Sequence, residues 1–229
     1  RTNDFGTSIG SEQPFEGTVG VAPALYLKLS APVVSGSGTK ADPFVVAGGS
    51  FRFADLAGYE YASSSILALA DRGVVNGTGG GNFSPSNNVT RADFIIMLMR
   101  ALGHQGPGIS SFNDVSKDAY YYDAVSGAKL RGYINGGGNG NFNPSEPVTK
   151  QDMYVITARA LSIDSGKMML YAPDALSSFT DAYVLSGYAQ GPIAWLSALG
   201  IMPSSGLIEP TKNATRADCA VFIFRLACS

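Results

Sequence analysis

Apolar residues along most of this chain follow helical stripes that come in pairs. In the first pair, Ile66, Leu69 and Val74 lie on one face of a helix that begins near Tyr61, and Gly73 or a neighbour ends it. A glycine-rich loop follows, and then a second stripe of four residues, namely Phe94, Met97, Leu98 and Ala101. Because residues three or four apart share a helical face, the pattern predicts a helical hairpin in which each helix buries one side.

This pair of stripes occurs three times, marked by four landmarks in constant order. Phe53-Ala54-Asp55 recurs as Phe112-Asn113-Asp114 at an offset of 59, and again as Phe179-Thr180-Asp181 at an offset of 67. The other landmarks are Phe83-Ser84-Pro85, Phe142-Asn143-Pro144 and Ile208-Glu209-Pro210; Thr90 to Asp93, Thr149 to Asp152 and Thr215 to Asp218; and Arg100-Ala101-Leu102, Arg159-Ala160-Leu161 and Arg225-Leu226-Ala227. Such a register predicts an internal triplication.

The landmarks divide most of the chain into copies at residues 51–108, 109–176 and 177–229. The first-helix stripe recurs in the later copies, at Val125, Ala128 and Tyr133 and at Ile193, Leu196 and Ile201. A single helical hairpin of this size cannot bury its stripes alone, so we expect three copies to pack around a shared centre. The predicted fold class is therefore mainly α.

Residues 1–50 do not join the repeat. The runs Val19–Leu29 and Pro43–Val46 are strand-like, and Ser35 to Gly38 between them is typical of a hairpin or a linker. We interpret this segment as a β-like tail of a preceding domain, or as a linker. Since the chain opens on Arg1, we expect it to be a piece of something longer.

Composition excludes several classes of function. With 16 Lys and Arg against 18 Asp and Glu, the net charge of −2 offers no basic stripe for nucleic acid. The run Phe94 to Met99, which no apolar run of the chain exceeds in length, is far short of the roughly 20 residues that a membrane-spanning helix needs. One histidine and two cysteines are too few for a zinc site, and the glycine-rich loops lack the aspartates of a calcium loop. We therefore predict no nucleic acid, no membrane insertion, no metal and no cofactor.

The cysteines and the histidine point to no catalysis. Cys219 and Cys228 are nine positions apart on one predicted helix, which puts them on opposite faces, so they should not pair with each other. Cys219 occupies the place of Phe94 in its copy, which indicates a core thiol. His104 lies in a Gly/Pro-rich stretch and is interpreted as a solvated linker histidine. No pair of nucleophile and base is visible, and we predict that the chain is not an enzyme.

The landmarks Phe-x-Asp, a tyrosine six or seven residues later, Gly-x-Phe-x-Pro and Thr-Arg-x-Asp resemble the S-layer homology family, from about Phe51 to the C-terminus. The resemblance implies a monomer with pseudo-threefold symmetry, in which a central helical bundle carries three prongs. It also implies that grooves between the prongs bind an anionic secondary cell-wall polysaccharide, commonly one with pyruvylated N-acetylmannosamine. Such modules attach proteins non-covalently to the bacterial cell surface.

Under that resemblance, the first residue after each capping threonine becomes the main candidate for carbohydrate binding: Arg91, Lys150 and Arg216. Free NH groups at a helix start together with a mobile cation suit the carboxylate of a pyruvyl ketal. The alternative is an internal ion pair with the carboxylate of Phe-x-Asp. Lysine is a point charge whereas arginine forms two parallel hydrogen bonds, so we expect Lys150 to be the weakest of the three.

Three further sets complete the candidate carbohydrate site. Tyr61, Tyr120 and Tyr188 stand where the family commonly has tryptophan, and their rings either pack against sugar or belong to the core. Gly81, Gly140 and Gly206 allow positive φ and close approach of a ligand, although turn geometry alone explains them equally well. Asp55, Asp114 and Asp181 are expected to cap or brace the first helix of each copy.

The third copy departs most from the pattern, because its loop after Ile201 is shorter and Ile208-Glu209 replaces the phenylalanine and its neighbour. We therefore expect unequal grooves, with the Arg91 groove strongest and the Arg216 groove second. The predicted function is anchoring of a surface protein to the bacterial cell wall. The alternatives are a protein–protein module of the cell envelope and the anchor part of a larger surface enzyme.

Overall fold

The computed structural model describes residues 33–35, 45–46, 53–104, 112–137, 139–170, 173–203 and 205–228, and the chain divides into a unit of residues 1–50 and a unit of residues 51–229. In the first unit, β1 (Val33–Ser35) pairs antiparallel with β2 (Val45–Val46). The strand β2 falls within the predicted run at 43–46, whereas β1 was not predicted. The predicted strand at residues 19–29 lies outside the described residues.

The second unit is helical, as predicted. The described residues hold six α-helices, two from each copy of the repeat: α1 (Glu60–Asp71) and α2 (Arg91–Ala101), α3 (Tyr122–Leu130) and α4 (Lys150–Ser165), and α5 (Gly187–Ala198) and α6 (Arg216–Cys228). The short 3-10 turns η1 (Pro173–Leu176) and η2 (Ala182–Val184) precede α5. The prediction of a mainly α fold is confirmed.

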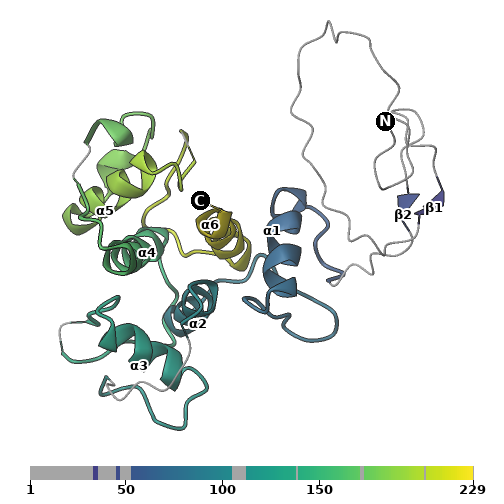
Figure 1. The fold of residues 1–229 in the computed structure, drawn as a ribbon, viewed down its shortest axis with the longest axis horizontal. Coiled ribbons are helices and arrows are strands. Elements are labelled where there is room, and N and C mark those ends of the chain that lie inside the picture. Colours follow the sequence, from purple (N-terminus) through teal and green to yellow (C-terminus); the bar gives the residue numbers. More distant parts are fainter. Residues whose placement is uncertain are drawn as a thin grey trace, which may run out of the picture. The chain divides into compact units, whose positions relative to one another are not determined.

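The helices pair between copies. The first helix of each copy packs against the second helix of another copy: α3 against α2, α5 against α4, and α1 against α6. Figure 1 shows α2, α4 and α6 on the inside, with α1, α3 and α5 around them. The predicted hairpin within one copy is therefore replaced by an exchange between copies, and the last helix of the chain covers the first.

The backbone closes the same circle at the centre. The segments that precede α2, α4 and α6 form a ring of hydrogen bonds in which the Val89 NH donates to Ala214 O at 2.9 Å, the Ala214 NH to Val148 O at 2.8 Å, and the Val148 NH to Val89 O at 2.9 Å. Each segment thus donates to one neighbour and accepts from the other. This cyclic pattern is a pseudo-threefold arrangement of the three copies.

Threonine begins each inner helix, as the sequence predicts. The hydroxyls of Thr90 and Thr149 accept from the backbone NH three residues later, at 3.1 and 3.2 Å. At α6 the cap is reciprocal, because the Thr215 NH also donates to the Asp218 carboxylate at 2.9 Å. These bonds satisfy NH groups that a helix start otherwise leaves without an acceptor, and they set where the following cation leaves the backbone.

The core is made of the predicted stripes. The three positions of the first-helix stripe are at most 5% exposed in every copy, although the last of each, at Val74, Tyr133 and Ile201, lies just past the end of its helix. The connecting-loop residues Phe83, Phe142 and Ile208 are almost fully buried. Cys219 is also buried, with its sulfur 3.7 Å from that of Met153, and burial raises the pKa of its thiol. Cys219 is therefore a neutral packing residue, as expected; the side chain of Cys228 lies outside the described residues. The only tryptophan, Trp195, is 6% exposed and packs in the core.

The interpretation of His104 as a solvated linker residue is wrong. Its Nε2 atom lies 2.8 Å from Oδ2 of Asp164, and the other oxygen of Asp164 accepts a hydrogen bond from the Tyr133 hydroxyl. The pair joins the end of α2 to the end of α4. A partner 60 residues away leaves no trace in the local composition from which the histidine was judged.

Candidate functional site

Two arginines at the starts of inner helices are held by the loop of another copy. The Nε atom of Arg91, the first residue of α2, donates to Phe142 O at 3.0 Å, and its guanidinium lies 5.0 Å from the centre of the Phe142 ring. Arg216 of α6 repeats this with Phe83, at 2.7 and 4.3 Å. Stacking on the ring and one hydrogen bond fix each guanidinium plane and leave its outer NH groups for other acceptors.

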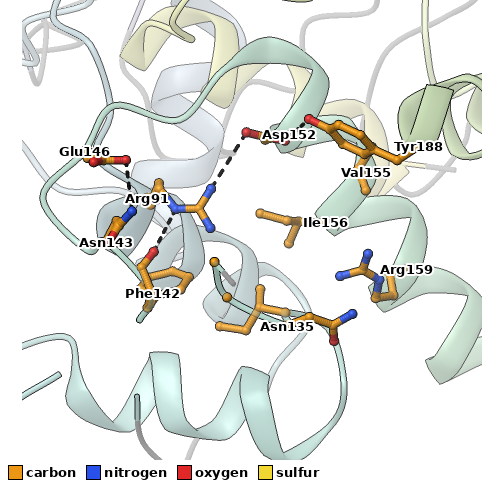
Figure 2. Close-up of a pocket in the computed structure, with 13 residues that line it drawn as sticks. Arg91, Asn135, Phe142, Asn143, Glu146, Asp152, Val155, Ile156, Arg159 and Tyr188 are labelled. Atoms are coloured by element: carbon orange, nitrogen blue, oxygen red, sulfur yellow. Dashed lines mark hydrogen bonds and ion pairs between the residues drawn. The ribbon is translucent and has the colours of Figure 1, made fainter. Parts of the chain in front are cut away.

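Arg91 faces a cleft of about 470 Å³ that residues of all three copies line (Figure 2). Across it, Asp152 of α4 lies 3.8 Å from Nη1 of Arg91 and accepts from the Tyr188 hydroxyl of α5 at 2.7 Å. Arg159 lies two turns further along α4, and its Nη1 donates to the Tyr133 carbonyl at 3.1 Å. The cleft therefore presents two guanidinium groups beside a tyrosine ring and the apolar side chain of Ile156.

Arg216 lines a smaller cleft of about 250 Å³. Its Nη2 donates to Asn76 O at 2.6 Å, in addition to the bond from Nε, so fewer of its donors remain for a ligand than at Arg91. Tyr120 closes this cleft as Tyr188 closes the other, because its hydroxyl donates to Asp93 at 2.9 Å. Arg100, the counterpart of Arg159, also lines it.

The third cation, Lys150, is engaged by carboxylates. Its Nζ lies 2.6 Å from Glu209 and 3.3 Å from Asp218, and its side chain is 14% exposed. Burial disfavours the charged form, but the two carboxylates outweigh burial and raise the pKa of Lys150. The ammonium therefore stays charged and is neutralised within the protein.

The aspartates of Phe-x-Asp hold the connecting loops. The two oxygens of Asp55 accept from the NH groups of Phe83 and Ser84 at 2.7 and 2.6 Å. Asp114 and Asp181 make the same two bonds in their copies, at 2.8 and 2.7 Å each. They do not cap the first helix, since α1 and α3 begin without a side-chain cap. Their expected place at the first helix is wrong, and the bonds they do make fix the loops that contact Arg216, Arg91 and Lys150 of other copies.

The glycines of the loop adopt the positive φ that was expected, 77° at Gly81, 76° at Gly140 and 111° at Gly206. Their carbonyls accept from the residue that precedes each of these aspartates. None of the three is among the residues that line the two arginine clefts, and Gly136 and Gly137 line the Arg91 cleft instead. This geometry favours a role in the turn.

The three tyrosines lie at the surface. Tyr61, Tyr120 and Tyr188 are 63, 74 and 57% exposed. Partial burial and the hydrogen bond to an aspartate raise the pKa of Tyr120 and of Tyr188 to about 12, so both remain hydroxyls at neutral pH. Partial burial and the Asp218 carboxylate also raise the pKa of Tyr61. The expectation that these rings form groove walls stays a prediction, and Tyr120 and Tyr188 are in position for it.

Sequence reasoning missed Arg159, although it was visible as part of the recurring Arg-Ala-Leu landmark. That landmark was used only to mark the ends of the copies. Its arginine is seven residues after the aspartate that follows each capping threonine, so the two lie about two helical turns apart on the same helix. Such a spacing is enough to predict that Arg159 and Asp152 share one face of α4, but it does not tell which cleft that face lines.

The hydrogen bonds between Asp55 and its loop and the ion pairs of Glu209 make the free energy of unfolding depend on pH in the acid range. Partial burial by itself raises the pKa of Asp55, but the NH groups of Phe83 and Ser84 hold it below the ordinary 3.8; Lys150 and Lys212 lower the pKa of Glu209 below 4.5. Both groups bind protons less readily when folded, so their contribution to stability is complete above these ordinary values and is lost as pH falls from them through the lowered pKa values of the folded state. We expect the unfolding free energy, measured by urea titration, to be flat from about pH 7 to 5 and to decline below about pH 4.5. An Asp55→Asn variant that keeps the full decline would contradict the assignment of Asp55.

Within the described residues there is no cluster of histidine, cysteine or acidic side chains that could hold a metal ion, and none of the described helices is long and apolar enough to cross a membrane.

Comparison with known proteins gives one family and several curated relatives. The profile of the S-layer homology domain matches residues 52–95 and 111–153. The chain is 30% identical over 180 residues to an endoglucanase of Bacillus sp. (strain KSM-635), covering 77% of the chain and 19% of that protein. It is 28% identical over 170 residues to a surface-layer 125 kDa protein of Lysinibacillus sphaericus, and 30% identical over 171 residues to an amylopullulanase of Thermoanaerobacterium thermosulfurigenes. These matches cover 72% of the chain but only 14% and 9% of those proteins, so the chain spans less than a fifth of each relative.

Proposed function

Because the chain carries S-layer homology segments at residues 52–95 and 111–153, we propose that it anchors a larger protein to the cell wall by binding an anionic wall polysaccharide in the clefts of Arg91 and Arg216. The predicted location at the bacterial cell surface, attached to the wall, is confirmed by this family match and by the surface-layer relative. The relatives include both surface-layer and enzyme names, which fits an anchor that different proteins share.

The Arg91 cleft carries the proposal. A guanidinium stacked on Phe142 keeps its orientation, and its outer NH groups match the two oxygens of a carboxylate. Arg159 adds a second positive charge, while Tyr188 and Ile156 offer apolar surface for the face of a sugar ring. A pyruvylated N-acetylmannosamine unit has this combination of a carboxylate and a pyranose ring, so it is the proposed ligand.

We extend the family assignment to the third copy, residues 177–229, which makes three S-layer homology motifs with boundaries at 51–108, 109–176 and 177–229. Asp181 holds Ile208 and Glu209 as Asp55 and Asp114 hold their loops, and Thr215 caps α6 as Thr90 caps α2. One such module with internal threefold symmetry completes its own clefts, so we propose that it acts as a monomer and without catalysis.

The function is tested by titrating the protein with purified wall polysaccharide before and after its pyruvyl groups are removed by mild acid. We expect saturable binding that falls at least tenfold without the ketals, because a hydrogen bond to a charged group contributes about 1.5–3 kcal/mol. Binding that survives their removal would contradict capture of a sugar acid. Binding only to proteins stripped from the wall would favour the protein–protein module instead.

A further inference from the structure

Each inner helix begins with a positively charged residue, and we call these three the groove cations: Arg91, Lys150 and Arg216. Their side chains leave the helices in the same way. The backbone NH groups of Arg91, Lys150 and Arg216 each donate to a carbonyl of another copy, and all three bonds measure 2.8 Å. The three side chains therefore start from equivalent positions. Any difference between the grooves arises from what each side chain meets beyond its Cβ.

Besides having lysine for arginine and Ile208 for a phenylalanine ring, the Lys150 groove differs at the loop position that follows this ring. The residue that follows the buried loop residue is Ser84 in the first copy, Asn143 in the second and Glu209 in the third. Arg91 and Arg216 bind the backbone carbonyl that precedes this position, whereas Lys150 binds the Glu209 carboxylate itself, at 2.6 Å. The third copy thus brings its own carboxylate to a groove cation.

Building on the proposed function, we propose that Glu209 stands in for the sugar carboxylate in the Lys150 groove, so that this groove is closed to the anionic polysaccharide while the Arg91 and Arg216 grooves bind it.

The carboxylate of Glu209 is well anchored. One oxygen binds Lys150, the other binds Lys212 at 2.5 Å, and the backbone NH of Glu209 donates to Asp181 at 2.7 Å. A sugar acid that displaced Glu209 would exchange one carboxylate for another and would also lose its own translational and rotational freedom. Because the internal carboxylate is covalently tethered, its effective concentration far exceeds that of a free ligand.

The backbone at this position supports the same inference. Glu209 has a φ of 53°, and Ser84 and Asn143 have a φ of 57°. Asparagine tolerates this left-handed conformation better than glutamate does. The backbone conformation at this position is therefore unfavourable for glutamate, and the contact of Glu209 with Lys150 offsets that cost.

The test exchanges the residues of two grooves. The variant Glu209→Asn gives the third copy the residue of the second, and Asn143→Glu is the matched converse next to Arg91. The full chain is titrated calorimetrically with the methyl glycoside of pyruvylated N-acetylmannosamine, and circular dichroism checks that each variant is folded. We expect Glu209→Asn to take up one more equivalent of glycoside than the wild type, and Asn143→Glu to take up one fewer.

Two results would overturn the inference while the wild type still binds: an unchanged stoichiometry in folded Glu209→Asn, or a loss of one equivalent when Lys150→Ala is made in the wild type. Absence of any binding by the wild type would instead refute the proposed function. The rate of Lys150 acetylation by acetic anhydride, followed by mass spectrometry, decides the role of Glu209 without a sugar. We expect faster acetylation in Glu209→Asn than in the wild type, and an equal rate would reject the inference.

Discussion

Replacing Arg91 with alanine is expected to weaken binding of the wall polysaccharide by about 10- to 100-fold, the equivalent of one or two hydrogen bonds to a charged group. The loss is large because Arg91 has more unused donors than Arg216, and because its cleft is the larger of the two. Affinity is measured by calorimetry, alongside thermal unfolding. We expect unfolding to change little, since the protein loses one hydrogen bond, one stacking contact and a partly exposed ion pair with Asp152.

Three further variants serve as comparisons for Arg91→Ala. Arg91→Lys keeps the charge but not the planar fork, so its affinity should lie between those of the wild type and Arg91→Ala. Arg72→Ala removes a cation at the end of α1, outside both arginine clefts, and should bind as the wild type does. Lys150→Ala should leave affinity nearly unchanged. Equal losses at Arg91, Lys150 and Arg216 would refute the ranking of the grooves.

Replacing Asp114 with alanine is expected to have a large effect on stability, similar to that of the same change at Asp55 or Asp181, which make the same two bonds. Both of its oxygens accept from backbone NH groups, and the NH of Phe142 belongs to a fully buried residue. Leaving these donors without an acceptor should cost about 2–4 kcal/mol of unfolding free energy. In a domain of this size, that corresponds to a melting temperature lower by about 4–16 °C.

The matched control for Asp114→Ala is Asp118→Ala, an exposed aspartate four residues later, whose removal should change the melting temperature little. Asp114→Ala should also weaken binding in the Arg91 cleft, because Phe142 supports the Arg91 guanidinium by its carbonyl and its ring. A variant Asp114→Ala that melted as the wild type does but lost sugar binding would show that Asp114 contacts the ligand directly. Its hydrogen bonds to the loop would then not explain its role.

Much of the fold could be predicted from the sequence because the relevant signals are local. A helix that buries one face must space its apolar residues by the helical period, as Ala62, Ile66 and Leu69 of α1 do, and all three are buried. A helix start leaves NH groups without partners, so Thr90 and Thr149 mark the two starts that they cap. Repetition in three copies then separated these signals from chance.

What could not be predicted concerns partners that are distant in the chain. Periodicity tells which face of a helix is buried but not what covers it, so the pairing of α1 with α6 was missed. Asp55 reaches NH groups 28 and 29 residues away, and those NH groups carry no side-chain signal that a sequence displays. Arg159 and His104 were misjudged for the same reason, since both bind atoms that only the folded chain brings near.

The packing of α1 against α6 limits how this fold can evolve by gain or loss of a copy. An open solenoid can gain or lose a unit at its end, because each unit contacts only its neighbours in a line. Here the ring of Val89, Val148 and Ala214 has no free end, and loss of any one unit would strip the cover from an inner helix on one side and from an outer helix on the other. We therefore expect the three copies to be gained or lost together. Binding strength can then change by substitution of single residues or by duplication of all three copies.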